Sequence, residues 1–200
     1  MKKLVVATGN PGKLKEIQEY LTNLAIELHL KPDSLEIDET GTTFVENARL
    51  KASQVANALG EWAIADDSGL EVEALDGAPG IYSARYARSD RERIDRLLDE
   101  LGNNTNRQAR FICAIALARP DGAIVASVEG ICPGEILYTP CGTGGFGYDP
   151  IFYVPQEKQT FAQMKPEVKH KISHRGKAFE KLIPQLRELG IGDWGLGIGD

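Results

Sequence analysis

Two adjacent carboxylates, Asp66 and Asp67, are the first candidates for chemistry in this chain. The uncharged run 62–65 before them predicts a buried strand, and Asp-Asp-Ser-Gly at 66–69 predicts the loop that leaves it. Successive side chains of an extended segment point to opposite sides, so we expect the two carboxylates to have different surroundings, one of them facing a cleft. Asp and Ser supply the hard oxygen ligands that hold Mg²⁺ when a phosphate completes the coordination. The alternative is a simple turn, because all four residues are common turn formers.

A second candidate is the segment 8–13, Thr-Gly-Asn-Pro-Gly-Lys, which follows a short apolar strand at 3–7. Apolar residues then recur at helical spacing, at Leu14, Ile17, Leu21 and Leu24. A glycine loop at a helix start turns backbone N–H groups toward a phosphate, and Lys13 adds a full positive charge. The spacing is not that of a Walker A motif, so by itself the segment leaves phosphate binding open.

The glycine-dense stretch 142–150 contains Gly-x-Gly-x-x-Gly, the dinucleotide fingerprint by letter. A strand-like run, Pro-Ile-Phe-Tyr-Val at 150–154, follows it where that fingerprint requires a helix, so we reject a Rossmann NAD site. Glycines around the lone Phe146 instead indicate a loop whose flat ring can stack on an aromatic base.

Positive and hydrogen-bonding groups gather at 169–175, before a final helix with an apolar stripe. Ser173 is the expected N-cap, which places His174 and Arg175 on the first turn, where an anion or a carbonyl oxygen would be attracted. A solvated basic surface is the alternative. Pro184 predicts a kink or an early end of this helix, and the Gly-rich tail 190–200 is expected to be loose unless Trp194 anchors it.

Three other elements are predicted by local patterns. A capping box at Thr43–Glu46 starts a helix that passes through Asn47 and Lys51 and stops at Gly60, and those two side chains are expected on its solvated face. A second capping box at 89–92 starts a structural helix with a clean apolar stripe. Segments 110–118 and 123–131 flank Pro-Asp-Gly and predict a hairpin, 134–138 a further strand, and 71–75 a half-buried strand.

The composition limits the class of protein. The chain has 200 residues, 42% of them hydrophobic and 26% charged, which suits one soluble globular domain or two small lobes. A net charge of -6 argues against a nucleic-acid strand as the main partner. The three cysteines form no Cys-x-x-Cys pair, and no apolar run is long enough for an export signal or a membrane span, so we expect a reduced, cytoplasmic location.

Six motifs occur in the order and spacing of one known family, and they cover the chain to about residue 189. They are Thr8-Gly-Asn-x-x-Lys13, Thr43-Phe-x-Glu-Asn-Ala48, Ala65-Asp-Asp-Ser-Gly-Leu70, Pro79-Gly-Ile-Tyr-Ser-Ala-Arg-Tyr86, Gly144-Gly-Phe-Gly-Tyr-Asp-Pro150 and Ser173-His-Arg-Gly176. The sequence thus resembles the Ham1-like inosine/xanthosine triphosphate pyrophosphatases. It departs from the usual pattern at 162–164 and 168–170, although Lys169 is kept.

The resemblance implies an elongated, two-lobed α/β fold over residues 1–189, with a long central mixed sheet, flanking helices and a nucleotide cleft between the lobes. It implies a cytoplasmic homodimer that hydrolyses ITP, dITP and XTP to the monophosphate and pyrophosphate with Mg²⁺, which keeps such nucleotides out of DNA and RNA.

The resemblance also implies roles for single residues. Asp67 is the proton acceptor and a metal ligand, Lys13 a second catalytic residue, and Glu39, otherwise a surface acid, the other metal ligand. The triphosphate is held by Thr8, Gly9, Asn10, Pro11, Gly12, Lys13 and Ser68. The base is surrounded by Phe146, Gly147, Tyr148, Asp149, Lys169, His174 and Arg175.

Three rival functions stay open at this stage. A related pyrophosphatase acting on modified pyrimidines would share the triphosphate handling and differ at the base. A nucleotide sensor would bind without turnover, and the presence of Asp67, Glu39 and Lys13 speaks against it. An NAD-dependent enzyme is disfavoured by the strand that follows the glycine-dense stretch.

Overall fold

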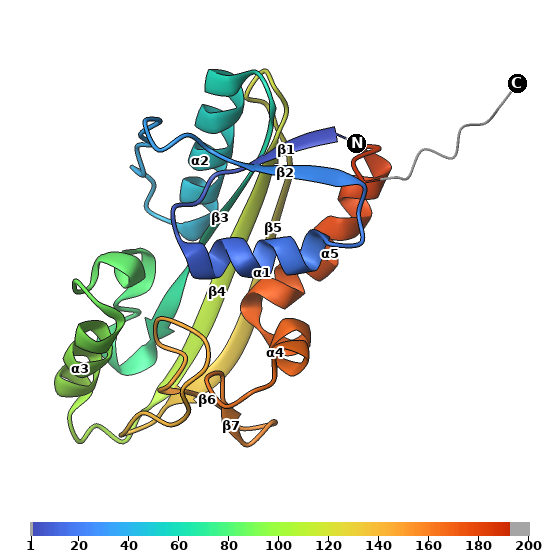
Figure 1. Ribbon diagram of the computed structural model, residues 1–200. Coiled ribbons are helices and arrows are strands. Elements are labelled where there is room, and N and C mark those ends of the chain that lie inside the picture. Colours follow the sequence, from blue (N-terminus) through green and yellow to red (C-terminus); the bar gives the residue numbers. More distant parts are fainter. Residues whose placement is uncertain (1, 193–200) are drawn as a thin grey trace, which may run out of the picture. The chain divides into compact units, whose positions relative to one another are not determined.

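Strands and helices alternate through the first half of the chain, as in α/β proteins (Figure 1). The computed structural model describes residues 2–192. The strands are β1 (Lys2–Val6), β2 (Ile26–Leu30), β3 (Trp62–Val72), β4 (Gln108–Ala118), β5 (Ile124–Ile136), β6 (Phe152–Val154) and β7 (Gln159–Thr160). The helices are α1 (Pro11–Leu21), α2 (Phe44–Leu59), α3 (Asp90–Leu101), α4 (Pro166–Ile172) and α5 (His174–Glu188), with 3₁₀ turns η1 (Glu73–Leu75) and η2 (Gly80–Arg85).

The strands form one mixed sheet of seven in the order β2-β1-β3-β4-β5-β6-β7, which confirms the predicted fold class. The described residues divide into two compact units, the first made of residues 2–67, 114–129 and 178–192 and the second of 68–113 and 130–177. The unit boundaries fall inside β3, β4, β5 and α5, so these four elements contribute residues to both units.

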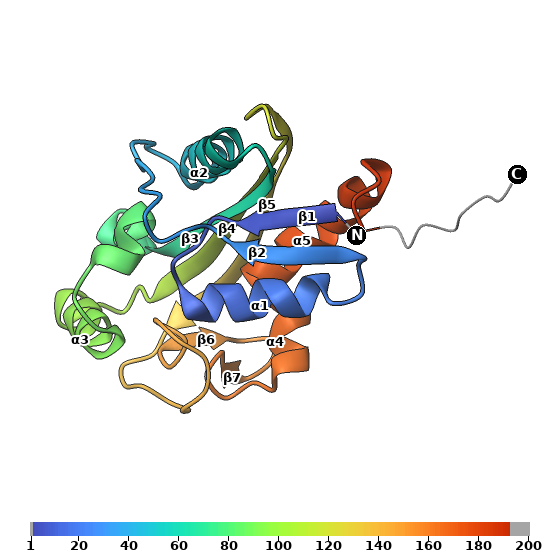
Figure 2. The ribbon, with the colours of Figure 1, turned by 45° about the horizontal axis from the view of Figure 1, so that its top comes forward.

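The first unit is a parallel βαβ arrangement. β1 pairs in parallel with β2 on one side and with β3 on the other. Right-handed crossovers that leave in opposite directions along a sheet place their helices on opposite faces. Figure 2 shows α2 on one face and α1 on the other, and α5 lies with α1, since the Tyr20 and Phe179 rings stack 4.7 Å apart.

The second unit has its own apolar core. The side chains of α3, including Leu97, pack against inward-facing residues of β3, β4 and β5. Phe111, Phe152 and Phe161 form an aromatic cluster at its centre, with ring centroids 4.6 to 5.7 Å apart. β6 and β7 continue the sheet as short antiparallel strands.

Local end signals were predicted correctly. Thr43 and Ser89 cap α2 and α3 by accepting the N–H groups of Glu46 and Glu92. Gly60 ends α2 in the left-handed conformation, with φ 64°. The Pro-Asp-Gly hairpin between β4 and β5 is also present. These features depend on three or four neighbouring residues, which is why the sequence alone identifies them.

Several predicted boundaries were wrong. Residues 66–69 are not a loop, because β3 runs through them to Val72. α1 already begins at Pro11, inside the predicted glycine loop, because proline suits the first turn of a helix. The strand predicted at 134–138 is the end of β5, and α4 was not predicted.

The last helix also differs from expectation. α5 continues past Pro184 to Glu188, so no early end occurs. The start of the tail is packed, since Ile191 is buried and Gly192 pairs with Ala25. Trp194 and the rest of the tail lie outside the described residues. No helix among residues 2–192 is both long and apolar enough to cross a bilayer.

Candidate active site

A buried lysine joins two carboxylates in the first unit. Lys51 projects from α2, and its Nζ lies 2.8 Å from Asp67 Oδ1 on β3 and 2.9 Å from Glu39 Oε1 in the segment before α2. The Lys51 side chain is only 8% exposed. Because both carboxylates contact the same nitrogen, Glu39 and Asp67 are close neighbours. The prediction that they are ligands of one metal ion requires this closeness.

The second carboxylate of β3 faces a different lysine. Asp66 Oδ1 lies 2.6 Å from Lys13 Nζ, and the Asp66 side chain is 1% exposed. Alternation along the strand thus separates the two neighbours, as predicted. Each aspartate has its own ammonium group.

The segment 8–13 is held in place by its own side chains. Asn10 is the N-cap of α1, and its Oδ1 accepts the N–H groups of Gly12 at 2.9 Å and Lys13 at 3.2 Å. Thr8 Oγ1 accepts the Asn10 N–H. The result is a fixed strand-to-helix junction with a positive helix end and Lys13 beside it, an arrangement that suits an anion.

Burial and charge act in opposite directions on the Asp67 and Lys51 pair. Burial raises the pKa of the Asp67 carboxyl, Lys51 and Lys13 lower it, and nearby Glu39 raises it again, so the net change is upward. Burial lowers the pKa of Lys51, but two carboxylates oppose it and the net change is also upward. Lys51 thus stays an ammonium, while Asp67 is a carboxylate with increased proton affinity.

Asp67 has one oxygen left for another ligand. Its Oδ2 is buried and accepts no hydrogen bond from any group among the described residues. A buried carboxylate oxygen without a partner is costly, and a cation would compensate it. No group of three or more His, Cys, Asp or Glu side chains that could hold a metal occurs in residues 2–192. With two neighbouring carboxylates and the unpartnered Oδ2 of Asp67, the residues present fit a hard divalent cation that takes its further ligands from phosphate and water.

In the second unit the glycine-dense loop is closed around Asp149. Asp149 Oδ2 accepts the Phe146 N–H at 2.9 Å and lies 2.7 Å from Lys169 Nζ. Lys169 Nζ also lies 5.0 Å from the centre of the Phe146 ring. Gly145 has φ 73°, and a Cβ there would collide with the Asp149 carboxylate, so only glycine allows this closure.

Basic groups at the start of α5 complete this second cluster. Ser173 Oγ caps the helix by accepting the Gly176 N–H, as predicted. His174 stacks on Phe111 at 4.7 Å between ring centroids. Arg175, 1% exposed, donates from Nη2 to Ser68 Oγ at 2.8 Å.

Comparison with known proteins identifies the family of this chain. The model of the Ham1 family matches residues 4–185. The chain belongs to the Ham1 family. It is 63% identical over 186 residues to a dITP/XTP pyrophosphatase of Nostoc sp. (strain PCC 7120), covering 93% of this chain and 95% of that protein. A dITP/XTP pyrophosphatase of Synechocystis sp. (strain PCC 6803) is 62% identical over 185 residues, which are 92% of this chain and 95% of the relative.

A solved structure supports the same assignment. The HAM1 protein from Coxiella burnetii superimposes with a TM-score of 0.86 at 44% identity, covering 94% of this chain and all of that one. The resemblance to the Ham1-like family, first suggested by six motifs, is confirmed.

In this Ham1-family chain the predicted site residues form two clusters. The first unit brings together Lys13, Glu39 and Asp67, next to the capped segment 8–12. In the second unit, Lys169 contacts Asp149 and the Phe146 ring, Phe161 lies near both Lys169 and His174, and Arg175 contacts Ser68. Tyr148 is buried, and its hydroxyl donates to the Ser83 carbonyl, so it anchors the loop to the core.

Lys51 was missed. The expectation of a solvated face for Asn47 and Lys51 was wrong, because both are buried. Asn47 Oδ1 accepts the Gly41 N–H and so fixes the segment after Glu39. A usable signal was the spacing of Lys51 within the apolar stripe of Phe44, Ala48 and Val55, which places it on the buried side of the helix.

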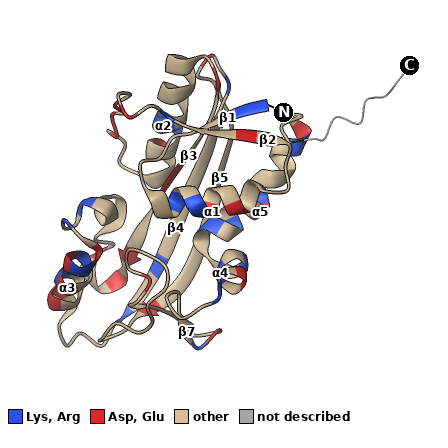
Figure 3. Cartoon of the chain, viewed as in Figure 1, with Lys and Arg blue, Asp and Glu red and all other residues tan. Residues whose placement is uncertain are grey.

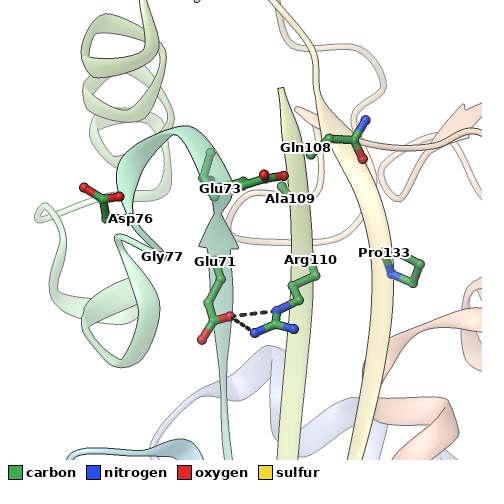
Figure 4. Close-up of a pocket in the computed structure, with 9 residues that line it drawn as sticks. Glu71, Glu73, Asp76, Gly77, Gln108, Ala109, Arg110 and Pro133 are labelled. Atoms are coloured by element: carbon green, nitrogen blue, oxygen red, sulfur yellow. Dashed lines mark hydrogen bonds and ion pairs between the residues drawn. The ribbon is translucent and has the colours of Figure 1, made fainter. Parts of the chain in front are cut away.

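One open pocket of about 510 Å³ in the Ham1-family chain lies apart from the predicted residues. It is lined by Glu71, Val72, Glu73, Asp76, Gly77, Gln108, Ala109, Arg110 and Pro133, and Figure 4 shows the Glu71 and Arg110 ion pair in it. Asp66, Asp67 and the Phe146 loop are absent from its lining.

Proposed function

We propose that this chain is a nucleoside triphosphate pyrophosphatase that hydrolyses dITP, ITP and XTP to the monophosphate and pyrophosphate. The observation that carries the proposal is the cluster around Lys51, in which two carboxylates converge beside the capped start of α1. The relatives at 63% and 62% identity are dITP/XTP pyrophosphatases, which supports this substrate class. Removal of these triphosphates keeps them out of DNA and RNA.

Triphosphate binding falls to the segment Thr8–Lys13 and to Ser68. The positive end of α1 and the Lys13 ammonium attract the phosphate oxygens. Asp66 holds Lys13 at 2.6 Å and so fixes the direction of that ammonium. Ser68 lies two residues after Asp66 on β3, so these two side chains share one side of the strand.

Asp67 is the proton acceptor for the attacking water. Its increased proton affinity suits a group that takes a proton near neutral pH. Lys51 fixes one oxygen and leaves the other for catalysis. Glu39 and Asp67 would hold Mg²⁺, which neutralises charge on the departing pyrophosphate when bound.

Base recognition falls to the second cluster. Phe146 offers a stacking surface next to the Lys169 ammonium. Arg175 and Lys169 carry hydrogen-bond donors only. Hypoxanthine, xanthine and guanine present an oxygen at C6, whereas adenine presents an amino donor, so a donor-lined site disfavours ATP.

The decisive experiment is a comparison of substrates. The protein is incubated with dITP, XTP, dGTP, dATP and a methylated UTP, with Mg²⁺ or with EDTA, and the products are separated. We expect pyrophosphate from dITP and XTP, and only with the metal. Orthophosphate as the sole inorganic product would contradict the bond assignment, and preferred turnover of the pyrimidine would contradict the base assignment.

Assembly and location form part of the same proposal. We infer a cytoplasmic homodimer that acts as one catalytic domain over residues 1–189 and needs neither a nucleic-acid strand nor a membrane. Sedimentation equilibrium at micromolar concentration tests the dimer, and a monomeric mass in active preparations would contradict it.

A further inference from the structure

A residue outside the glycine-dense loop holds that loop, because its side chain accepts a hydrogen bond from the loop backbone. Asp90, the first residue of α3, accepts the Gly147 N–H on Oδ2 at 2.7 Å, across 57 residues of sequence. Its other oxygen, Oδ1, lies 2.6 Å from Arg93 Nη1. Both oxygens of one carboxylate are therefore used, one within the helix and one toward the loop.

The hydrogen bond acts on the peptide group that carries Phe146 forward to Gly147. The carbonyl of this peptide accepts the Asp149 N–H at 3.2 Å, and its N–H donates to Asp90. Asp149 also accepts the N–H of Phe146 itself. The peptide plane is thus held from both sides, and Asp90 supplies the side that comes from outside the loop.

Gly147 makes this external contact important. Its φ is 61°, and a Cβ there would meet nothing within 4 Å, so the side of Gly147 where a side chain would lie is open. Glycine has many accessible conformations, and the Asp90 hydrogen bond selects one of them. The same peptide plane sets ψ of Phe146, and so it sets the path of the backbone from which the Phe146 ring projects.

We propose that Asp90 is a positioning residue for the base, which keeps the Phe146 loop in its binding conformation. The inference rests on the proposed function, since it needs the loop to bind a purine. Pre-ordering a loop strengthens binding by removing the entropy cost of ordering it later. Lys13, Glu39, Lys51 and Asp67 form the phosphate cluster, and Asp90 does not belong to it. Loss of the Asp90 carboxylate should therefore raise KM for the nucleotide and leave kcat nearly unchanged.

A purely structural role predicts a different pattern. An acidic residue on the first turn stabilises α3 through the helix dipole and the ion pair with Arg93. Asn in place of Asp90 removes that charge but keeps an oxygen that accepts the Gly147 N–H. If positioning is the role, Asp90→Asn therefore retains most of the nucleotide affinity and Asp90→Ala does not.

The kinetic test compares both variants with a control on the same helix. Asp95 lies further along α3 and pairs with Arg91 at 3.8 Å. Figure 3 shows charges of both signs along this helix. We expect Asp90→Ala to raise KM for dITP about tenfold and to change kcat by less than about twofold. Loss of one charge-assisted hydrogen bond is large enough to weaken binding by about this factor. Asp90→Asn and Asp95→Ala should stay within about threefold of wild type.

Equal impairment of Asp90→Ala and Asp90→Asn would overturn the inference, and so would a wild-type KM in Asp90→Ala. A second measurement does not depend on activity. Hydrogen exchange of the segment 142–150 should quicken in Asp90→Ala and stay slow in Asp95→Ala, and unchanged exchange would also contradict it. An inactive wild-type enzyme would refute the proposed function, while an active wild type with an unaffected Asp90→Ala variant would refute only the positioning role.

Discussion

The phosphate cluster of the first unit and the glycine-dense segment 142–150 of the second unit, here called the base loop, are held in place by different kinds of contact. Lys13, Lys51, Asp66 and Asp67 project from regular helices and strands and are fixed by buried ion pairs. The base loop has no regular structure around Phe146 and is fixed by backbone hydrogen bonds and by left-handed glycines. In the phosphate cluster the contacts fix the positions of charged side chains, whereas in the base loop they fix the conformation of the backbone.

This difference determines how each region fails. Removing one partner of a buried ion pair leaves the other charge without compensation, at a cost of about 3–5 kcal/mol. Losing one loop hydrogen bond costs about 1–3 kcal/mol and leaves the reacting groups in place. Substitutions in the phosphate cluster should therefore lower kcat and stability, and substitutions in the loop should raise KM.

The largest effect is expected for Asp67→Asn. The amide cannot take a proton from water, and it weakens a cation site, so turnover of dITP should fall at least about a thousandfold. Circular dichroism should show a folded protein, because Glu39 still pairs with Lys51. Asp121→Asn, on an exposed turn, serves as the matched control. Wild-type rates in Asp67→Asn would remove this residue from the mechanism.

Lys51→Met tests the buried pairing itself. Methionine has a similar length but leaves Glu39 and Asp67 facing each other without the ammonium. We expect the free energy of unfolding in urea to fall by about 3 kcal/mol and kcat to fall about a hundredfold. Lys51→Arg keeps the charge and should recover part of the stability. An unchanged unfolding midpoint in Lys51→Met would mean that burial, rather than pairing, dominates this cluster.

Gly145→Ala should affect binding more than stability. The added Cβ would meet the Asp149 carboxylate in a backbone region unfavourable to alanine, so the loop must open. We expect KM for dITP to rise about tenfold and kcat to change little. Gly60→Ala is the matched control, since Gly60 also has a positive φ, of 64°, but no close neighbour. It should cost about 1 kcal/mol of stability, because alanine is disfavoured in the left-handed conformation, and it should leave KM unchanged. Similar KM values in both variants would count against the loop as the base site.

Local sequence patterns predicted some elements of the fold correctly and others incorrectly. The helix caps at Thr43 and Ser89 depend on near neighbours and were predicted correctly. The turn-forming residues at 66–69 were misleading, because β3 continues through them as a strand that neighbours β4 in the sheet. Tertiary pairing of this kind overrides local preference.

Within the site, the family motifs identified residues but not their contacts. The pairing of Lys51 with Asp67 spans 16 residues, and that of Asp90 with Gly147 spans 57. No local pattern encodes which side chain meets which across such distances. Lys169 was selected by resemblance, but its position on α4 beside Asp149 emerged only from the structure.

The smallest effect is expected from chemical modification at the edge of the base loop. Cys141 is exposed, whereas Cys113 and Cys132 are buried, and burial raises the pKa of the Cys132 thiol to about 11. Iodoacetamide at pH 8 should therefore label one cysteine quickly in the native protein and all three after unfolding, which mass spectrometry can count. Because the Cys141 N–H donates to the Pro150 carbonyl and closes the loop, labelling should raise KM for dITP about twofold and leave kcat unchanged. A fall in kcat would show that the loop also controls the phosphate cluster, and the separation of the two regions would then be wrong.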